Sequence, residues 1–181
     1  MIARRLLTTL VALLVLGAGV MARPAIANAT PDGWIAEDDE EHGWDLSVMF
    51  AYHYWPGWGS VGAAVNLGIP IVPSGFTSSL NDAFYIEVDA SMGVGLSFWG
   101  SDFVNYTMAG VRWQVSLFEW LTVYAAARGG VALRLDAGTD RLFVYGVGGF
   151  AVGAIFPFTD FLAARVDLGF PGARAGLTFM F

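Results

Sequence analysis

The chain has 181 residues, of which 56% are hydrophobic and only 14% charged, and its formal net charge is −7. A soluble domain carries about 25% charged residues, so this composition indicates a large surface that does not face water. The acidic balance argues against nucleic-acid binding, which needs a basic footprint, and the absence of cysteine excludes disulfides and thiolate metal sites.

The first 27 residues have the three parts of a secretory signal peptide. Arg4 and Arg5 give a positive start, residues 6–20 form an apolar core, and residues 25–27 (Ala-Ile-Ala) fit a cleavage site. A retained transmembrane helix is the alternative, but the segment is short and wrongly flanked for one. We therefore expect the mature protein to begin at Asn28, without a lipid-anchoring cysteine.

Residues 28–43 form a short acidic segment that also contains Pro31 and Gly33. Such a segment buries too little apolar surface to offset its ordering entropy, so we expect a flexible leader. Its carboxylates could bind a cation, but it lacks the spaced Asp-x-Asp-x-Asp-Gly loop of a calcium site. We predict no metal site here, and we assign residues 44–181 to the folded domain.

Beyond the leader, polar and apolar residues alternate with a period of two, as they do in strands with one polar face. In the segment 121–136, Leu121, Val123 and Ala125 begin the apolar face, while Thr122 and Tyr124 begin the other. No apolar run past residue 30 reaches the roughly 18 residues of a spanning helix. A closed sheet is the other structure that leaves no backbone group unpaired in hydrocarbon.

The sequence therefore predicts an all-β fold, an antiparallel up-and-down transmembrane β-barrel of about eight strands. Turn-like joints fall at 55–58, 73–82, 100–102, 118–120, 137–140, 157–160 and 171–172, with aromatic residues concentrated near them, as in the girdles of membrane barrels. A soluble barrel or sandwich would have to enclose this large apolar half, which a lipid-facing exterior accommodates more simply. The predicted strands are 45–54, 61–71, 83–98, 105–117, 121–136, 141–156 (faces unassigned), 162–170 and a last strand ending on Phe181.

The last strand carries a local signature: Ala175, Leu177, Phe179 and Phe181 point outward, and an aromatic residue ends the chain. With the signal peptide and the upstream strands, the region 44–181 resembles the small eight-stranded outer-membrane β-barrels of Gram-negative bacteria (OmpA/OmpX/OmpW-like). The resemblance implies a place in the outer membrane among its lipids. It also implies that these four residues are an assembly signal for the barrel-assembly machinery, reached with the help of periplasmic chaperones.

The joints depart from the pattern of that superfamily, in which outward loops are long and periplasmic turns short. With both termini periplasmic, the outward joints at 55–58, 99–102, 136–140 and 170–172 are all short, and the longest joint, 73–82, falls on the periplasmic side. Either the strand count is off near 73–82, or this chain lacks the loops that adhesins use.

The inward faces hold charges of both signs, and an eight-stranded barrel has room only for its own side chains. Because unpaired buried charge is very costly, we predict a lumenal ion-pair network centred on Arg112, Arg128 and Arg165 with Glu87 and Asp89. Our first interpretation is a polar plug with a structural role in membrane integrity. The alternative is a narrow porin-like channel for ions or small solutes. Further charges expected inside the barrel are Arg134, Asp167 and Arg174.

Catalysis is the third class considered. The two histidines are His42, in the leader, and His53, predicted inward on the first strand with Ser47 on the same face. Six residues along a strand span roughly 20 Å, too far for a nucleophile–base hydrogen bond, although Ser60 or Ser101 could lie nearer. A lipid-modifying enzyme is thus the least favoured reading: we predict no enzyme, and no cofactor, because the sequence has no nucleotide or phosphate-binding fingerprint.

Overall fold

The computed structural model describes residues 42–55, 58–76, 80–96, 102–136 and 138–181. The predicted signal peptide and most of the predicted leader lie outside these residues. Within them, no helix is long and apolar enough to cross a membrane. The strands are β1 (Asp45–Trp55), β2 (Trp58–Val72), β3 (Asp82–Leu96), β4 (Asp102–Phe118), β5 (Leu121–Asp136), β6 (Arg141–Thr159), β7 (Leu162–Phe170) and β8 (Gly172–Met180).

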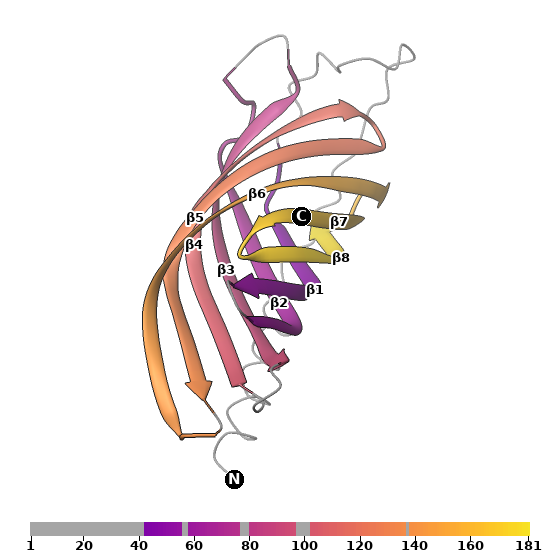
Figure 1. Cartoon of the computed structure of the whole chain (residues 1–181). Helices are drawn as coiled ribbons and strands as arrows, with labels where there is room; N and C mark the ends of the chain where they lie inside the picture. The colour runs from indigo at the N-terminus through magenta and orange to yellow at the C-terminus, as the bar shows by residue number, and fades with distance from the viewer. Residues whose placement is uncertain (1–41, 56–57, 77–79, 97–101, 137) are drawn as a thin grey trace.

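The eight strands form one closed barrel in sequence order, and each strand is antiparallel to both of its neighbours (Figure 1). The barrel closes where β8 pairs with β1, from Asp45 opposite Met180 to His53 opposite Gly172. The predicted up-and-down barrel is confirmed, and so is its strand count around 73–82, where β2 ends at Val72 and β3 begins at Asp82.

Side-chain burial follows the predicted period of two. In β5, Thr122, Tyr124 and Arg128 are buried, whereas Ala125 and Ala127 between them are exposed. The exposed positions form an apolar outer wall, on which large side chains are open to the surroundings: among them are Phe50 at 61%, Val152 at 56% and Leu168 at 57% exposure. In β5 the polar face therefore points into the barrel and the apolar face points outward.

Strand β6, whose faces the sequence left unassigned, follows the same rule. Val147, Ala151 and Ile155 are buried on the inner face, and Phe150 and Val152 point outward with exposures of 65% and 56%. Glycines occupy both faces of this strand, which is why alternation of polarity was not visible in the sequence.

Most predicted joints include one or more strand residues, and two of them, at 118–120 and 157–160, are shortened by a longer preceding strand. β4 continues to Phe118 and β6 to Thr159, so the turns after them are tighter than the predicted joints at 118–120 and 157–160. The reason is a β-bulge near each strand end: the register shifts between Ser116 and Phe118 and again between Pro157 and Thr159. A bulge inserts an extra residue without ending the pairing.

The last strand also ends differently from the prediction, at Met180 instead of Phe181. Its partner β1 begins at Asp45, so Phe181 has no strand residue opposite it. Phe181 nevertheless donates its backbone N–H to the carbonyl of Trp44 at 3.0 Å, and the two rings lie 5.5 Å apart. Phe181 therefore extends the contact between β8 and β1 by one residue beyond the paired strands.

The strands differ greatly in length, and this shapes the two ends of the barrel. We call the end where β1 begins and β8 finishes the termini end, and the opposite end the hairpin end. β6 has 19 residues and β7 only 9, and their pairing begins at Phe150 opposite Phe170. The β5–β6 hairpin, drawn in orange, therefore extends beyond β7, β8 and β1 at the hairpin end (Figure 1).

Candidate functional site

The centre of the lumen is organised around Glu87, which β3 points inward. Its Oε1 lies 3.1 Å from Arg112 Nη1 and 3.0 Å from Arg165 Nη2, and its Oε2 lies 2.8 Å from Arg128 Nε. The side chains of Glu87, Arg112 and Arg165 have no solvent exposure at all. One carboxylate thus binds three guanidinium groups from three different strands.

Two further carboxylates complete this group. Asp45, the first residue of β1, pairs with Arg112 and lies 3.7 Å from Arg165 Nη1. Asp167 on β7 lies 3.0 Å from Arg165 Nε and 3.4 Å from Arg128 Nη2. Three carboxylates therefore balance three guanidinium groups, as buried charges require. We call these residues the ionic cluster: Asp45, Glu87, Asp167, Arg112, Arg128 and Arg165.

Neutral side chains surround the ionic cluster and occupy the remaining guanidinium surface. Arg165 Nη1 donates to Ser47 Oγ at 3.2 Å and to Asn66 Oδ1 at 2.9 Å. The Arg112 guanidinium lies 4.1 Å from the centre of the Tyr85 ring, and that of Arg165 lies 4.7 Å from the Tyr124 ring, both within cation–π range. Arg112 and Arg165 therefore make polar contacts at the edge of the guanidinium group and ring contacts on its face.

Asp89 and Arg174 lie outside the ionic cluster and pair with each other instead. Asn66 joins the two groups, because its Nδ2 donates to Asp89 Oδ2 at 3.5 Å while its Oδ1 accepts from Arg165. The structure thus brings Glu87 together with the three predicted central arginines and places Asp89, also predicted at the centre, beside them with Arg174.

Arg134 is the remaining predicted lumenal charge, and it lies apart near the hairpin end. Its Nε donates to Asp102 Oδ2 at 2.9 Å, and its side chain is 28% exposed. Asp102 and Asp45 are both first residues of strands, which is why the sequence reading missed them as charge partners. Continuing the alternation backward by one inward position, from Ser47 and Val104, would have found both.

Glycines on the inner face make room for these large groups. A Cβ on Gly153 of β6 would lie 2.3 Å from Cζ and Oη of Tyr124, and a Cβ on Gly68 would lie 2.9 Å from Arg112 Nη2 and Asp45 Oδ2. β6 contributes no charge to the ionic cluster, but its lack of a side chain at Gly153 lets the Tyr124 ring lie across it. Tyr124 then donates to Asp167 and accepts from Arg165 Nε at 2.9 Å.

Toward the hairpin end, apolar side chains fill the part of the lumen beside β4, β5 and β6. Because β4 runs from Asp102 at that end toward the termini end, its residues 104–108 lie nearer the hairpin end than Arg112 does. The partly buried Phe170 packs against this group, and the His53 ring lies 4.7 Å from the Tyr106 ring. We call the buried members the apolar layer: Val104, Tyr106, Met108, Ala132 and Val147.

The polarity of β4 is reversed over this stretch. Asn105 and Thr107 point outward, while the apolar layer takes the inner positions between and beside them. The two outward side chains satisfy each other, since Thr107 Oγ1 donates to Asn105 Oδ1 at 3.3 Å and Asn105 Nδ2 donates to the Ser91 carbonyl at 3.2 Å. The inner face of this part of β4 is therefore apolar, and the lumen is not polar along its whole length.

His53 lies between two serines, both fully or almost fully buried. Its Nδ1 is 3.2 Å from Ser60 Oγ and its Nε2 is 3.0 Å from Ser91 Oγ. Ser47 is not near it; that hydroxyl bonds to Thr178 Oγ1 at 2.9 Å and to Arg165. Ser60, one of the two serines expected to lie nearer, does contact His53, and Ser101 lies outside the described residues. Both ring nitrogens of His53 are thus hydrogen-bonded to serine hydroxyls on the inner face of the barrel.

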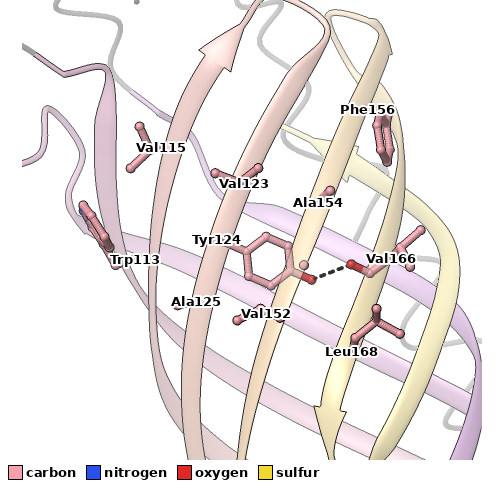
Figure 2. Close-up of a pocket in the computed structure, with 11 residues that line it drawn as sticks. Trp113, Val115, Val123, Tyr124, Ala125, Val152, Ala154, Phe156, Val166 and Leu168 are labelled. Atoms are coloured by element: carbon pink, nitrogen blue, oxygen red, sulfur yellow. Dashed lines mark hydrogen bonds between the residues drawn. The ribbon is translucent and has the colours of Figure 1, made fainter.

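The outer wall of β4 to β7 is hollowed into an apolar depression of about 650 Å³ (Figure 2). Its rim includes Trp113, Phe156 and Leu168, and Val115, although it faces outward, is only 8% exposed there. Figure 2 also shows Tyr124 reaching toward Val166, whose carbonyl accepts from the Tyr124 hydroxyl at 3.4 Å. The depression holds no charged side chain among its lining residues.

Five of the six arginines in the folded region point into the barrel. The folded region contains six arginines and no lysine by sequence: Arg112, Arg128, Arg134, Arg141, Arg165 and Arg174. All of them except Arg141 are paired with carboxylates on the inner face, whereas Arg141 is exposed at the start of β6. The outer wall is therefore apolar and without cations over the residues described.

The predicted assembly-signal residues lie along β8 and its end. Ala175 and Leu177 are exposed on the outer wall, and Phe179 is half-buried opposite Leu46 of β1. Phe181 follows the strand as described above. The described residues contain no cluster of His, Asp or Glu side chains arranged to hold a metal ion.

No family model matches this chain, and no curated protein sequence matches it either. Among solved structures, the chain is similar to Ail, the attachment invasion locus protein of Yersinia pestis, with 11% sequence identity and a TM-score of 0.44. The similarity covers 76% of this chain and 92% of that one.

Proposed function

We propose that this protein is a bacterial outer-membrane β-barrel with a structural role in membrane integrity, and that its lumen does not conduct. The observation that carries the proposal is the filling of the lumen by two successive obstructions. The ionic cluster contains side chains with no exposure, and the apolar layer follows it toward the hairpin end.

The outer wall supports a place in lipid. Large apolar side chains are exposed around the whole barrel, and the five inward arginines leave the wall without positive charge. A soluble barrel would need the reverse arrangement, because unmatched apolar patches of this size are rare on monomeric soluble proteins. Where all eight strands pair, the closed sheet also has no strand edge with unpaired backbone groups. A barrel in hydrocarbon requires this, because unpaired backbone groups there are costly.

The filled lumen argues for a structural role over transport. For an ion to pass, Glu87 or its three arginines would have to separate, which would leave charge unpaired at a buried site. It would then meet the apolar layer, whose side chains offer no hydrogen-bonding groups except the Tyr106 hydroxyl. A permanently open path through both is therefore not expected.

Location and folding are tested by gel mobility of outer-membrane fractions, unboiled against boiled. A stable membrane barrel resists detergent until it is heated, so we expect two different mobilities from the mature protein. The test also covers three predicted features: the signal peptide, the assembly signal and the association with the assembly machinery. The protein needs all three to reach the outer-membrane fraction. Identical mobilities together with a soluble periplasmic location would overturn the proposal.

Conduction is tested in planar bilayers with the wild-type protein and the Arg128→Ala variant. We expect no steps of conductance from the wild type. The variant removes the guanidinium that links Glu87 to Asp167. Stable wild-type conductance that Arg128→Ala alters would establish the narrow channel instead; absence of conductance in both, with the heat-dependent gel shift preserved, supports the sealed barrel.

We also propose that the protein is not an enzyme. His53 has two serine hydroxyls as partners, but these groups are buried inside the wall and no carboxylate hydrogen-bonds to the ring among the described contacts. Phospholipase and deacylase assays with wild type and His53→Ala should give equal, background rates. A wild-type activity that disappears in His53→Ala would contradict this.

A further inference from the structure

Residues 141–148 of β6 form an open strand edge at the hairpin end, and the next residue, Gly149, already lies against the backbone of Phe170. On one side they pair with β5 from Asp136 opposite Arg141 onward. On the other side, pairing with β7 begins only at Phe150 opposite Phe170. Among the described residues, no strand lies along this second side. At the standard rise, the open edge is roughly 30 Å long.

The open edge is apolar on both faces and exposed. Leu142 and Val144, on the outer face, are each 62% exposed, and Phe143 and Tyr145, on the inner face, are 38% and 36% exposed. Proteins normally block such edges with proline, lysine, inward charges or a bulge. Between residues 142 and 149 there is no proline and no charge, and the β5–β6 register is unbroken. The edge is therefore built to accept another strand.

A second copy of the same edge fits it. In the antiparallel register that pairs residues 142–148 with the same residues of a second copy, Tyr145 lies at the centre. Leu142 of one copy then faces Gly148 of the other, and Val144 faces Gly146. A Cβ on Gly146 would meet no atom within 4 Å, and one on Gly148 would meet only the Arg128 carbonyl at 3.9 Å. The barrel itself therefore leaves this space open, and the large side chains of a second copy would occupy it.

The inner face is compatible with the same register. Tyr145 faces its own counterpart, and Phe143 faces Val147. Aromatic and β-branched pairs directly across two strands are favourable, and Phe143 and Tyr145 are already stacked at a centroid distance of 6.4 Å. We propose that two copies of this protein associate through residues 142–148 of β6, paired antiparallel about Tyr145.

Antiparallel pairing fixes how the two barrels are related. Their β6 strands run in opposite directions, so the barrels meet by their hairpin ends and point away from each other. If the barrel spans a membrane, as proposed above, the two copies belong to facing membranes and cannot be neighbours in one. This consequence rests on the proposed function, whereas the pairing itself does not.

Cysteine cross-linking tests the register directly, because the chain has no native cysteine. Residues directly opposite in an antiparallel pair have Cβ atoms about 4.5–5.5 Å apart, close to the separation in a disulfide. Under mild oxidation in detergent, the Tyr145→Cys protein should form a covalent dimer. The matched control is Leu133→Cys, which has similar exposure, 37% against 36%, but lies on β5 with a neighbour strand on each side. Equal dimer yields from both variants would overturn the proposal.

A mixing experiment separates this register from its neighbours. Val144→Cys and Gly146→Cys proteins should cross-link when mixed and give little dimer alone, because residue 144 faces residue 146 and not itself. Dimer from Val144→Cys alone at the yield of the mixture would overturn the register centred on Tyr145.

The oligomeric state itself is measured by light scattering of the folded protein in detergent. The wild type should be dimeric, and Val144→Lys, which places a charge on the edge, should be monomeric. Both proteins should keep the heat-dependent gel shift, which shows that the barrel is folded. A monomeric wild type with a normal gel shift would overturn the pairing and leave the proposed barrel function standing. Loss of the shift in the wild type would instead contradict the proposed function.

Discussion

The ionic cluster and the apolar layer fill the same lumen in different ways. The ionic cluster draws its six members from β1, β3, β4, β5 and β7, and nearly every group contacts two or three partners of opposite charge. The apolar layer comes mainly from neighbouring strands β4, β5 and β6 and is held by contact alone. The ionic cluster therefore connects strands on opposite sides of the barrel, whereas the apolar layer packs beside β4, β5 and β6 only.

This difference bears on how each region responds to change. A buried ion pair contributes little net stability compared with apolar packing, but removing one partner is strongly destabilising because the other charge stays buried. When apolar atoms are removed from the apolar layer, the protein loses only their transfer free energy and the free energy of the cavity that they leave. We therefore expect single changes in the ionic cluster to have the larger effects.

The largest effect is expected from Glu87→Gln. It removes the one carboxylate shared by Arg112, Arg128 and Arg165 and leaves the cluster with an uncompensated positive charge. Destabilisation of about 3–5 kcal/mol is typical when a buried partner is lost, and it should appear in urea unfolding of the lipid-reconstituted protein. Glu119→Gln, the same change in the exposed turn between β4 and β5, is the control and should leave unfolding unchanged.

Met108→Ala tests the apolar layer and should come second. Met108 is 2% exposed and packs in the apolar layer with Tyr106 and Val104, so a loss of about 2–3 kcal/mol is expected, in the lower part of the range for Met→Ala substitutions in cores. The control is Met92→Ala on the outer wall, where Met92 is 37% exposed and its truncation leaves no cavity inside the barrel. A loss larger than that of Glu87→Gln would reverse the comparison.

Gly153→Ala tests whether the ionic cluster depends on space as well as charge. The new methyl group would collide with the Tyr124 side chain, which hydrogen-bonds to Asp167 and Arg165, and also with the backbone carbonyl of Val166. Overpacking of this kind costs about 1–3 kcal/mol. Gly146→Ala, where a Cβ meets nothing, should be neutral in the same unfolding assay. Equal effects of the two substitutions would show that Tyr124 moves aside freely.

Arg134→Gln should have the smallest effect. Its ion pair with Asp102 lies near the hairpin end, where the arginine side chain is 28% exposed and the Asp102 side chain 8% exposed, so the pair is less buried than the ionic cluster and only one carboxylate loses its partner. A loss of about 1 kcal/mol is expected, at the upper end of the range for exposed pairs, because the Asp102 carboxylate that remains is itself mostly buried. The loss should shrink in high salt. A loss equal to that of Glu87→Gln would mean that the pair belongs energetically to the buried network.

The strand faces were predictable because alternation of polar and apolar residues reports directly on the side each residue takes. Tyr85, Glu87 and Asp89 are an example: their inward direction followed from Ile86 and Val88 between them. The same rule implied that inward charges must pair. It could not say which carboxylate meets which arginine, because that depends on strand stagger around the barrel, and so Asp89 was expected where Asp45 and Asp167 lie.

The apolar layer was not predictable by that rule. Over residues 104–108 the inner positions are the apolar ones, and the outward Asn105 and Thr107 satisfy their polar groups locally. Nor could the role of Gly153 be seen, since an inward glycine carries no polarity signal and matters only through the ring of Tyr124 on the neighbouring strand. Both features are set by neighbours distant in sequence.

The inward direction of the arginines also determines where a protease can act. Trypsin cleaves after lysine and arginine, and in the folded region Arg141 is the one such residue that stands exposed at a strand end outside the lumen. The intact barrel should therefore be nicked once, between Arg141 and Leu142. Its two pieces should stay together through the β5–β6 and β1–β8 ladders and separate only on boiling.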